Sequence, residues 1–128
     1  MVTTPDRALA DELVDRLVGE RLIACGNITA SVTSIYRWQG AIERADEVLV
    51  IMKTTEALAA RVVARVRELH SYEVPEVLFF PVTTANDAYI EWVRESVMTA
   101  QENEDATKEG PAAGTRRSNL GGSAHERP

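Results

Sequence analysis

The stretch ELHSYEVPEVLFFPV, residues 68–82, gathers several side chains that could do chemistry. His70 offers a neutral imidazole, a ligand type that suits copper and zinc, so it is the candidate metal ligand. The same position, directly after a helical pattern, also suits a helix end, where histidine interacts with the last carbonyls and the dipole. A lone histidine lacks the partners of a tight site, so the helix-end interpretation is favoured unless a trimer brings three copies together.

Glu73 and Glu76 flank the Val74-Pro75 pair in the same stretch. As functional groups they could supply oxygen ligands or act as an acid/base pair. In an extended strand, residues three apart point to opposite faces, which disfavours a paired role. Two charges at the entrance of a strand is therefore the favoured interpretation.

Cys25 and Lys53 are the other candidate reactive groups. Cys25 could be a soft copper ligand or a nucleophile, although a small buried apolar residue is the favoured interpretation. Lys53 could neutralise a nearby acid or bind an anion, and the sequence leaves both open. Because Cys25 is the only cysteine, no intrachain disulfide can form, which favours the cytoplasm.

Composition narrows the possible functions of the 128-residue chain. Its formal charge of −6 disfavours nucleic-acid binding, since phosphate contacts need clustered basic residues. The N-terminus does not resemble a signal peptide, and apolar runs such as VLVIM at 48–52 are too short to span a membrane. No phosphate-binding loop, HExxH, GxSxG or paired CxxC motif is present, so we do not expect an enzyme.

Periodicity predicts seven elements in residues 1–98. A stub strand precedes a helix that starts with a hydroxyl cap in Thr4-Pro5-Asp6 and ends at Gly19. Alternating residues then predict a long strand over 22–39, with a bulge or bend at Gly26 and a hairpin turn at Gly40. The remaining elements are a strand ending in the run 48–52, a helix from 54 to 70, an apolar strand over 73–82 buried on both faces, and a last helix capped at 86–87.

This order predicts an α+β fold, a ferredoxin-like β-α-β-β-α-β sandwich with a C-terminal helix. Two helices are expected to cover one face of a four-stranded antiparallel sheet. The hairpin is longer than such a sheet needs, so we expect it to pair with other subunits, with Tyr36 and Trp38 as interface anchors. Residues 99–128 have few large apolar side chains and are predicted to be a disordered tail after a domain at 1–98.

Five segments in order, ERLIACGNI, SIYRWQGAIE, EVLVIMKT, LHSYEVPEVLFFPV and DAYIEWV, resemble the CutA family of divalent-ion-tolerance proteins. The resemblance covers about residues 2–98 and implies a homotrimer joined through the long hairpins, without enzymatic activity. It also implies tolerance of copper or other divalent cations, which would be the expected ligands in place of a resident cofactor. The fold is similar to that of trimeric nitrogen-signalling regulators, so a small-ligand sensor or scaffold is the alternative.

The chain departs from the family pattern at three positions. Ser71 follows His70 where the family usually has proline. Leu69 and Thr3 stand where some members have a second histidine and a cysteine. These differences remove groups that could complete a copper site.

Overall fold

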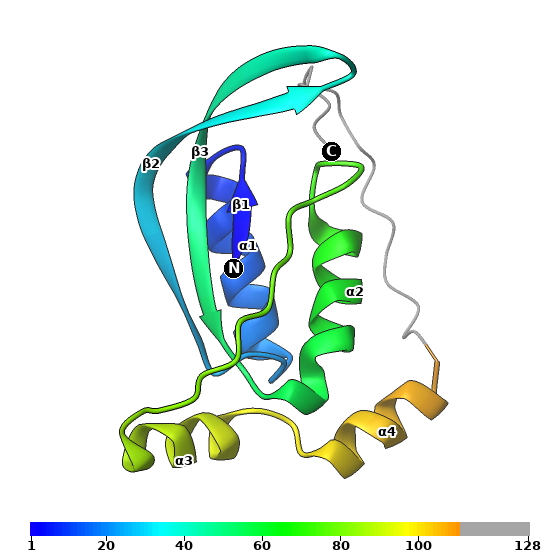
Figure 1. The fold of residues 1–128 in the computed structure, drawn as a ribbon. Coiled ribbons are helices and arrows are strands. Elements are labelled where there is room, and N and C mark those ends of the chain that lie inside the picture. Colours follow the sequence, from blue (N-terminus) through cyan, green and yellow to red (C-terminus); the bar gives the residue numbers. More distant parts are fainter. Residues whose placement is uncertain (111–128) are drawn as a thin grey trace.

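The structure is a computed structural model, and it describes residues 1–110. Its core is a three-stranded antiparallel sheet in the order β1-β3-β2, with helices α1 and α2 packed beside each other against it (Figure 1). Helices α3 and α4 follow at the end of the sheet where β3 leads into α2 (Figure 1). The elements are β1 Val2–Thr4, α1 Arg7–Gly19, β2 Cys25–Trp38, β3 Ala41–Lys53, the 3₁₀ helix η1 Glu56–Leu58, α2 Ala59–Leu69, α3 Asp87–Ser96 and α4 Ala100–Lys108.

The predicted fourth strand is reduced to a short contact beside β1. Val77 forms an isolated antiparallel bridge with Val2, and Met1 and Leu78 exchange backbone hydrogen bonds of 2.8 and 3.0 Å. This places the segment next to β1, so the ferredoxin-like fold class is confirmed. The prediction that residues 73–82 are buried on both faces is wrong: Phe80 is 64% exposed and Val82 is 70% exposed, because most of this segment lies outside the sheet.

Strands β2 and β3 form the long hairpin, and its tip projects well beyond β1 (Figure 1). The turn falls at Gln39-Gly40, as predicted, and positive φ values of 48° and 82° at these residues match a type I′ turn. The bulge lies between Ile28 and Ser31, not at Gly26 as predicted. Gly26 instead allows close approach to α1, since a Cβ there would lie 2.8 Å from a methyl of Val14.

The N-cap of helix α1 lies two residues later than the predicted hydroxyl cap, Thr4. The Asp6 carboxylate caps it by accepting the Leu9 N–H at 2.8 Å, while Thr4 ends β1 and donates its hydroxyl to the Asp6 carbonyl. Leu13 and Leu17, four residues apart on one face of the helix, are both fully buried. The same core contains, from the other elements, Val2, Val48, Val50, Leu58, Val62, Val66, Val93 and Val97.

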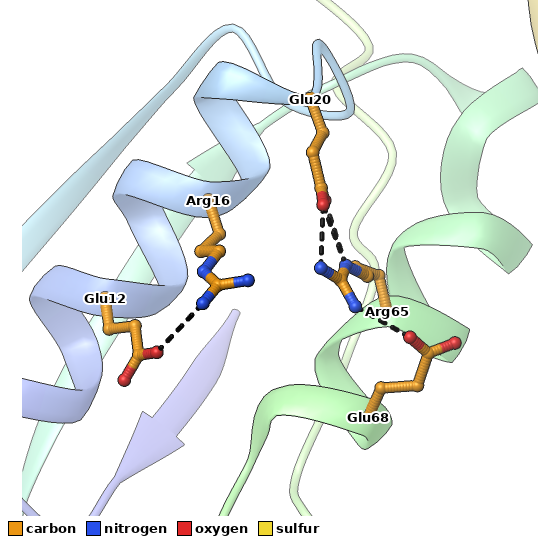
Figure 2. A network of polar contacts seen from close by, with 5 residues as sticks. All are labelled: Glu12, Arg16, Glu20, Arg65 and Glu68. Carbon is orange, nitrogen blue, oxygen red and sulfur yellow. Dashed lines mark hydrogen bonds and ion pairs between the residues drawn. The ribbon is translucent and has the colours of Figure 1, made fainter. Parts of the chain in front are cut away.

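An ion-pair network joins the end of α1 to α2 (Figure 2). Arg65 of α2 donates to both carboxylate oxygens of Glu20, the C-cap of α1, at 2.7–3.1 Å. A second amino group of Arg65 donates to Glu68 at 2.7 Å. Two-pronged hydrogen bonding fixes the guanidinium in one orientation, so this network adds a polar link to the apolar packing of α1 and α2.

Helix α4 occupies the start of the segment predicted to be disordered. Thr99 and Glu102 form a capping box, in which each side chain accepts the other residue's backbone N–H. The tail prediction is therefore wrong for residues 100–108, whereas 111–128 lie outside the described residues.

Candidate functional site

The candidate site is the junction that follows α2. His70 caps the helix, donating its backbone N–H to the Val66 carbonyl at 2.8 Å, and then turns to extended backbone. The buried face of α2 anchors this turn, because Val62 and Val66 belong to the core. His70 is itself buried, with 8% of its surface exposed. The predicted end of the helix at His70 is confirmed, although the ring contacts Thr3 and Tyr72 in place of the predicted last carbonyls of the helix.

Both ring nitrogens of His70 are engaged. Nδ1 accepts the backbone N–H of Tyr72 at 3.0 Å, and Nε2 lies 2.7 Å from the backbone carbonyl oxygen of Thr3. Since an amide N–H can only donate and a carbonyl can only accept, the ring is a neutral imidazole with its hydrogen on Nε2. Metal ligation requires a free lone pair on one nitrogen, so this arrangement does not fit a bound metal within one chain as it stands.

Tyr72 extends the junction into the sheet. Its hydroxyl donates to Oε2 of Glu47 on β3 at 3.0 Å, and both residues are buried. The rings of Tyr72 and His70 also pack together, with centroids 4.7 Å apart. The burial of Glu47, only 1% exposed, is offset by hydrogen bonding to this hydroxyl.

Glu76 closes the other end of the junction. Its carboxylate accepts the hydroxyl hydrogen of Thr3 at 3.0 Å. Glu73, in contrast, is exposed and lines a shallow surface hollow of about 320 Å³ with Arg67 and Glu68. The two glutamates thus lie in different surroundings, as their spacing predicts, and do not form an acid/base pair.

Together these contacts form a polar chain through the junction. It consists of Glu47, Tyr72, His70, Thr3 and Glu76, and it links β3 and β1 to the segment after α2. Sequence reasoning missed Glu47 and the hydroxyl of Tyr72. One available signal was a single acid at the start of the apolar run EVLVIM.

Cys25 and Lys53 pair with each other at the end of the hairpin that lies farthest from its turn. The Cys25 thiol lies 3.5 Å from the Tyr89 hydroxyl of α3, and this hydrogen bond is the main cause of a raised pKa for Tyr89. Lys53 donates to the side-chain oxygen of Asn27, so its ammonium group has a neutral partner. Cys25 is half-buried and not fully buried as favoured, and its contact does not involve the residues that hold His70.

Side chains that could bind a metal do not converge in the described part of the chain. Among residues 1–110 there is no group of three or more His, Cys, Asp or Glu side chains that could hold a metal ion. No helix in this part is both long and apolar enough to cross a membrane.

Comparison with known proteins identifies one family. Residues 1–96 match the model of the CutA1 divalent ion tolerance protein family. The divalent-cation tolerance protein CutA of Thermus thermophilus is 41% identical over 96 residues, which are 75% of this chain and 93% of that protein. Human protein CutA is 43% identical over 94 residues, 73% of this chain but only 52% of the human protein.

Solved structures show the same likeness. A divalent cation tolerance protein (Cut A1) from Thermus thermophilus superposes with a TM-score of 0.74 at 40% identity. The superposition covers 76% of this chain and 94% of that chain.

Proposed function

The chain belongs to the CutA1 family of divalent ion tolerance proteins, and on that premise we propose that it acts as a non-enzymatic homotrimer. The observation that carries the proposal is the apolar surface that one chain leaves exposed on the hairpin and on residues 74–82. Contiguous exposed apolar surface marks a contact with another protein surface. Its position on a long hairpin and on a sheet edge favours contact between copies of this chain.

The hairpin supplies the first part of this surface. Ile35 is 55% exposed and Ile42 is 70% exposed. Ile35 pairs with Arg44 and Ile42 pairs with Arg37 in the ladder, so the two isoleucines share one face near the tip. Tyr36 and Trp38 lie on the other face and are half-buried. We propose that one face or both are covered by neighbouring subunits.

The segment after the junction supplies the second part. Leu78, Phe79 and Phe80 are 44%, 43% and 64% exposed. Burying an aromatic side chain contributes roughly 1.5–3 kcal/mol, so leaving these residues in water would forfeit much of the stability a small domain has. We propose that this segment contacts a second copy of the chain. It either adds a strand to the sheet of that copy or packs against its hairpin.

Direct metal binding through His70 requires that one of its ring nitrogens give up its hydrogen-bond partner. A metal at Nδ1 would displace the Tyr72 N–H, and a metal at Nε2 would displace the proton donated to Thr3. We propose that copper or another divalent cation binds His70 weakly, by displacing one of these two hydrogen bonds. We also propose that metal tolerance depends on assembly of the subunits. Any ligation should therefore disturb the backbone signals of Thr3 and Tyr72.

Equilibrium dialysis of Cu²⁺ and Zn²⁺ against the full chain tests the metal proposal. His70→Asn is the variant, because its amide oxygen can still accept the Tyr72 N–H. His125→Ala is the control, since His125 is the only other histidine. Weak binding that is lost in His70→Asn and retained in His125→Ala would support a role for His70. Binding unchanged in His70→Asn would contradict it.

A growth experiment tests the tolerance function itself. We expect bacteria that lack their own family member to grow better under raised copper when they make this chain. Cells making Ile42→Asp, which adds a charge to the proposed subunit contact, should lose that benefit. Equal growth with and without the chain would contradict the function. The single cysteine supports a cytoplasmic location, which fractionation of the same cells would check.

A further inference from the structure

Helix α4 lies beyond residue 96, where the match to the family ends. It has nine residues and none of them is buried. A helix of this length is marginal by itself in water, because nucleating it costs more than its few hydrogen bonds return. Its order must therefore come from local capping and from contacts with the rest of the chain.

Local support for α4 is polar throughout. The capping box of Thr99 and Glu102 satisfies two backbone N–H groups at the first turn. Gln101 donates to Asp105 one turn later at 3.0 Å. These contacts favour the helix but do not attach it to the core.

Two arginines attach α4 to the core. Arg61 of α2 donates to the side-chain oxygen of Asn103 at 3.1 Å, and the Asn103 amide donates to the Ala57 carbonyl of η1 at 3.4 Å. Arg21, in the turn between α1 and β2, lies 3.4 Å from Glu102 and donates to the Val97 carbonyl at 3.1 Å. The side chains of Arg21 and Glu102 are 48% and 47% exposed, so salt screens their pairing.

From these contacts we propose that α4 is a reversible strap, which closes over the Arg21 turn and the start of α2 and opens without unfolding the core. No side chain of α4 itself is fully buried, and the contacts that join it to the rest of the chain include a few partly exposed polar ones. Such segments belong to the low-stability end of a protein's local openings. Because the isolated helix is marginal, opening and loss of helix are one event. Opening frees the Arg61 guanidinium, and the Arg21 amino group that faces Glu102, for other anionic or carbonyl partners, while the Arg21 bond to the Val97 carbonyl of the core is kept.

Hydrogen exchange followed by mass spectrometry on the full chain tests the strap. Arg61→Ala removes the contact with Asn103, while Arg67→Ala removes an equal charge from an exposed site on the same helix. Neither substitution changes the sequence of α4, so its intrinsic helix propensity is constant. We expect amides 100–108 to exchange roughly two- to tenfold faster in Arg61→Ala, the effect of losing the hydrogen bonds that one guanidinium nitrogen donates to the backbone and side-chain oxygens of Asn103. Core peptides of Arg61→Ala should exchange at the rate seen in the unaltered chain, and so should amides 100–108 of Arg67→Ala.

Asn103→Leu provides a second variant, since it removes the α4 side of the same side-chain contacts and leaves the side chains of the core unaltered. It should also speed exchange of 100–108, although leucine favours a helix more than asparagine does. Two results would overturn the proposal: unchanged exchange of 100–108 in both variants, or exchange of these amides as slow as that of core peptides in the unaltered chain.

Discussion

The hydroxyl of Tyr72 donates a 3.0 Å hydrogen bond to the carboxylate of Glu47, and both side chains are almost fully buried. The contact joins the segment after α2 to the middle of β3. Because Tyr72 also donates its backbone N–H to His70, one residue holds both the histidine ring and the buried acid. The junction thus acts first as a structural connection between α2 and the sheet.

Tyr72→Phe should lower the free energy of unfolding by about 1–3 kcal/mol, because it leaves a buried carboxylate without this donor. Urea unfolding at one fixed protein concentration measures the change, since assembly makes stability concentration-dependent. Tyr89→Phe is the control: Tyr89 is 40% exposed, so its loss should change stability by less than about 0.5 kcal/mol. Equal effects of the two substitutions would refute the special role of Tyr72.

Gly26→Ala should destabilise the fold by about 1–3 kcal/mol through overpacking. The added methyl would lie 2.8 and 3.0 Å from the two methyl groups of Val14. Gly19→Ala is the control, because nothing lies within 4 Å of a Cβ at that position. Combining Gly26→Ala with Val14→Ala should recover part of the loss in thermal unfolding. Failure of the double variant to recover any stability would show that space at Val14 is not the cause.

Arg65→Lys should cost about 1 kcal/mol, although it keeps the positive charge, because lysine cannot bond both oxygens of Glu20 in the geometry of Figure 2. The Arg65 side chain is 25% exposed, so solvent screens the pairing only partly. Arg94→Lys, at a side chain 64% exposed, should change stability by less than about 0.5 kcal/mol. Chemical unfolding of both variants checks this, and indistinguishable midpoints would contradict it.

Glu102 sets a pH limit on the capping of α4. The backbone N–H of Thr99 donates to its carboxylate and lowers the pKa of Glu102 below the ordinary value of 4.5. A lowered folded-state pKa means that this stabilisation is complete above pH 4.5 and is lost as the pH falls through the lower folded-state value. The Thr99 amide signal in NMR should therefore titrate with a midpoint below 4.5, and Glu102→Gln should abolish that titration. A midpoint at or above 4.5 would contradict the capping account.

Local signals predicted much of the fold. The end of α2 at His70 and the turn at Gly40 both follow from short-range patterns. The predicted strand over 73–82 is reduced to a single bridge with β1, because an apolar run favours burial but does not determine how a segment pairs with other strands. Helix α4 was missed because composition was weighed above the Thr99-x-x-Glu102 capping signature.

The candidate site was predictable only in part. The sequence identified His70 but could not show that both of its nitrogens are engaged, because Thr3 is 67 residues away in the chain. Glu47 was missed for the same reason: its partner Tyr72 is 25 residues distant. Long-range hydrogen bonds depend on how the strands are paired, and a local pattern does not contain that information.

Light scattering of the full chain after size-exclusion chromatography measures its oligomeric state. We expect a particle of about three times the 14.1 kDa chain mass at micromolar protein. Ile42→Asp should shift it toward smaller species, whereas Arg7→Asp, at an exposed site on α1, should leave it unchanged. A mass of a single chain at that concentration would contradict assembly through the hairpin and the exposed segment at 74–82.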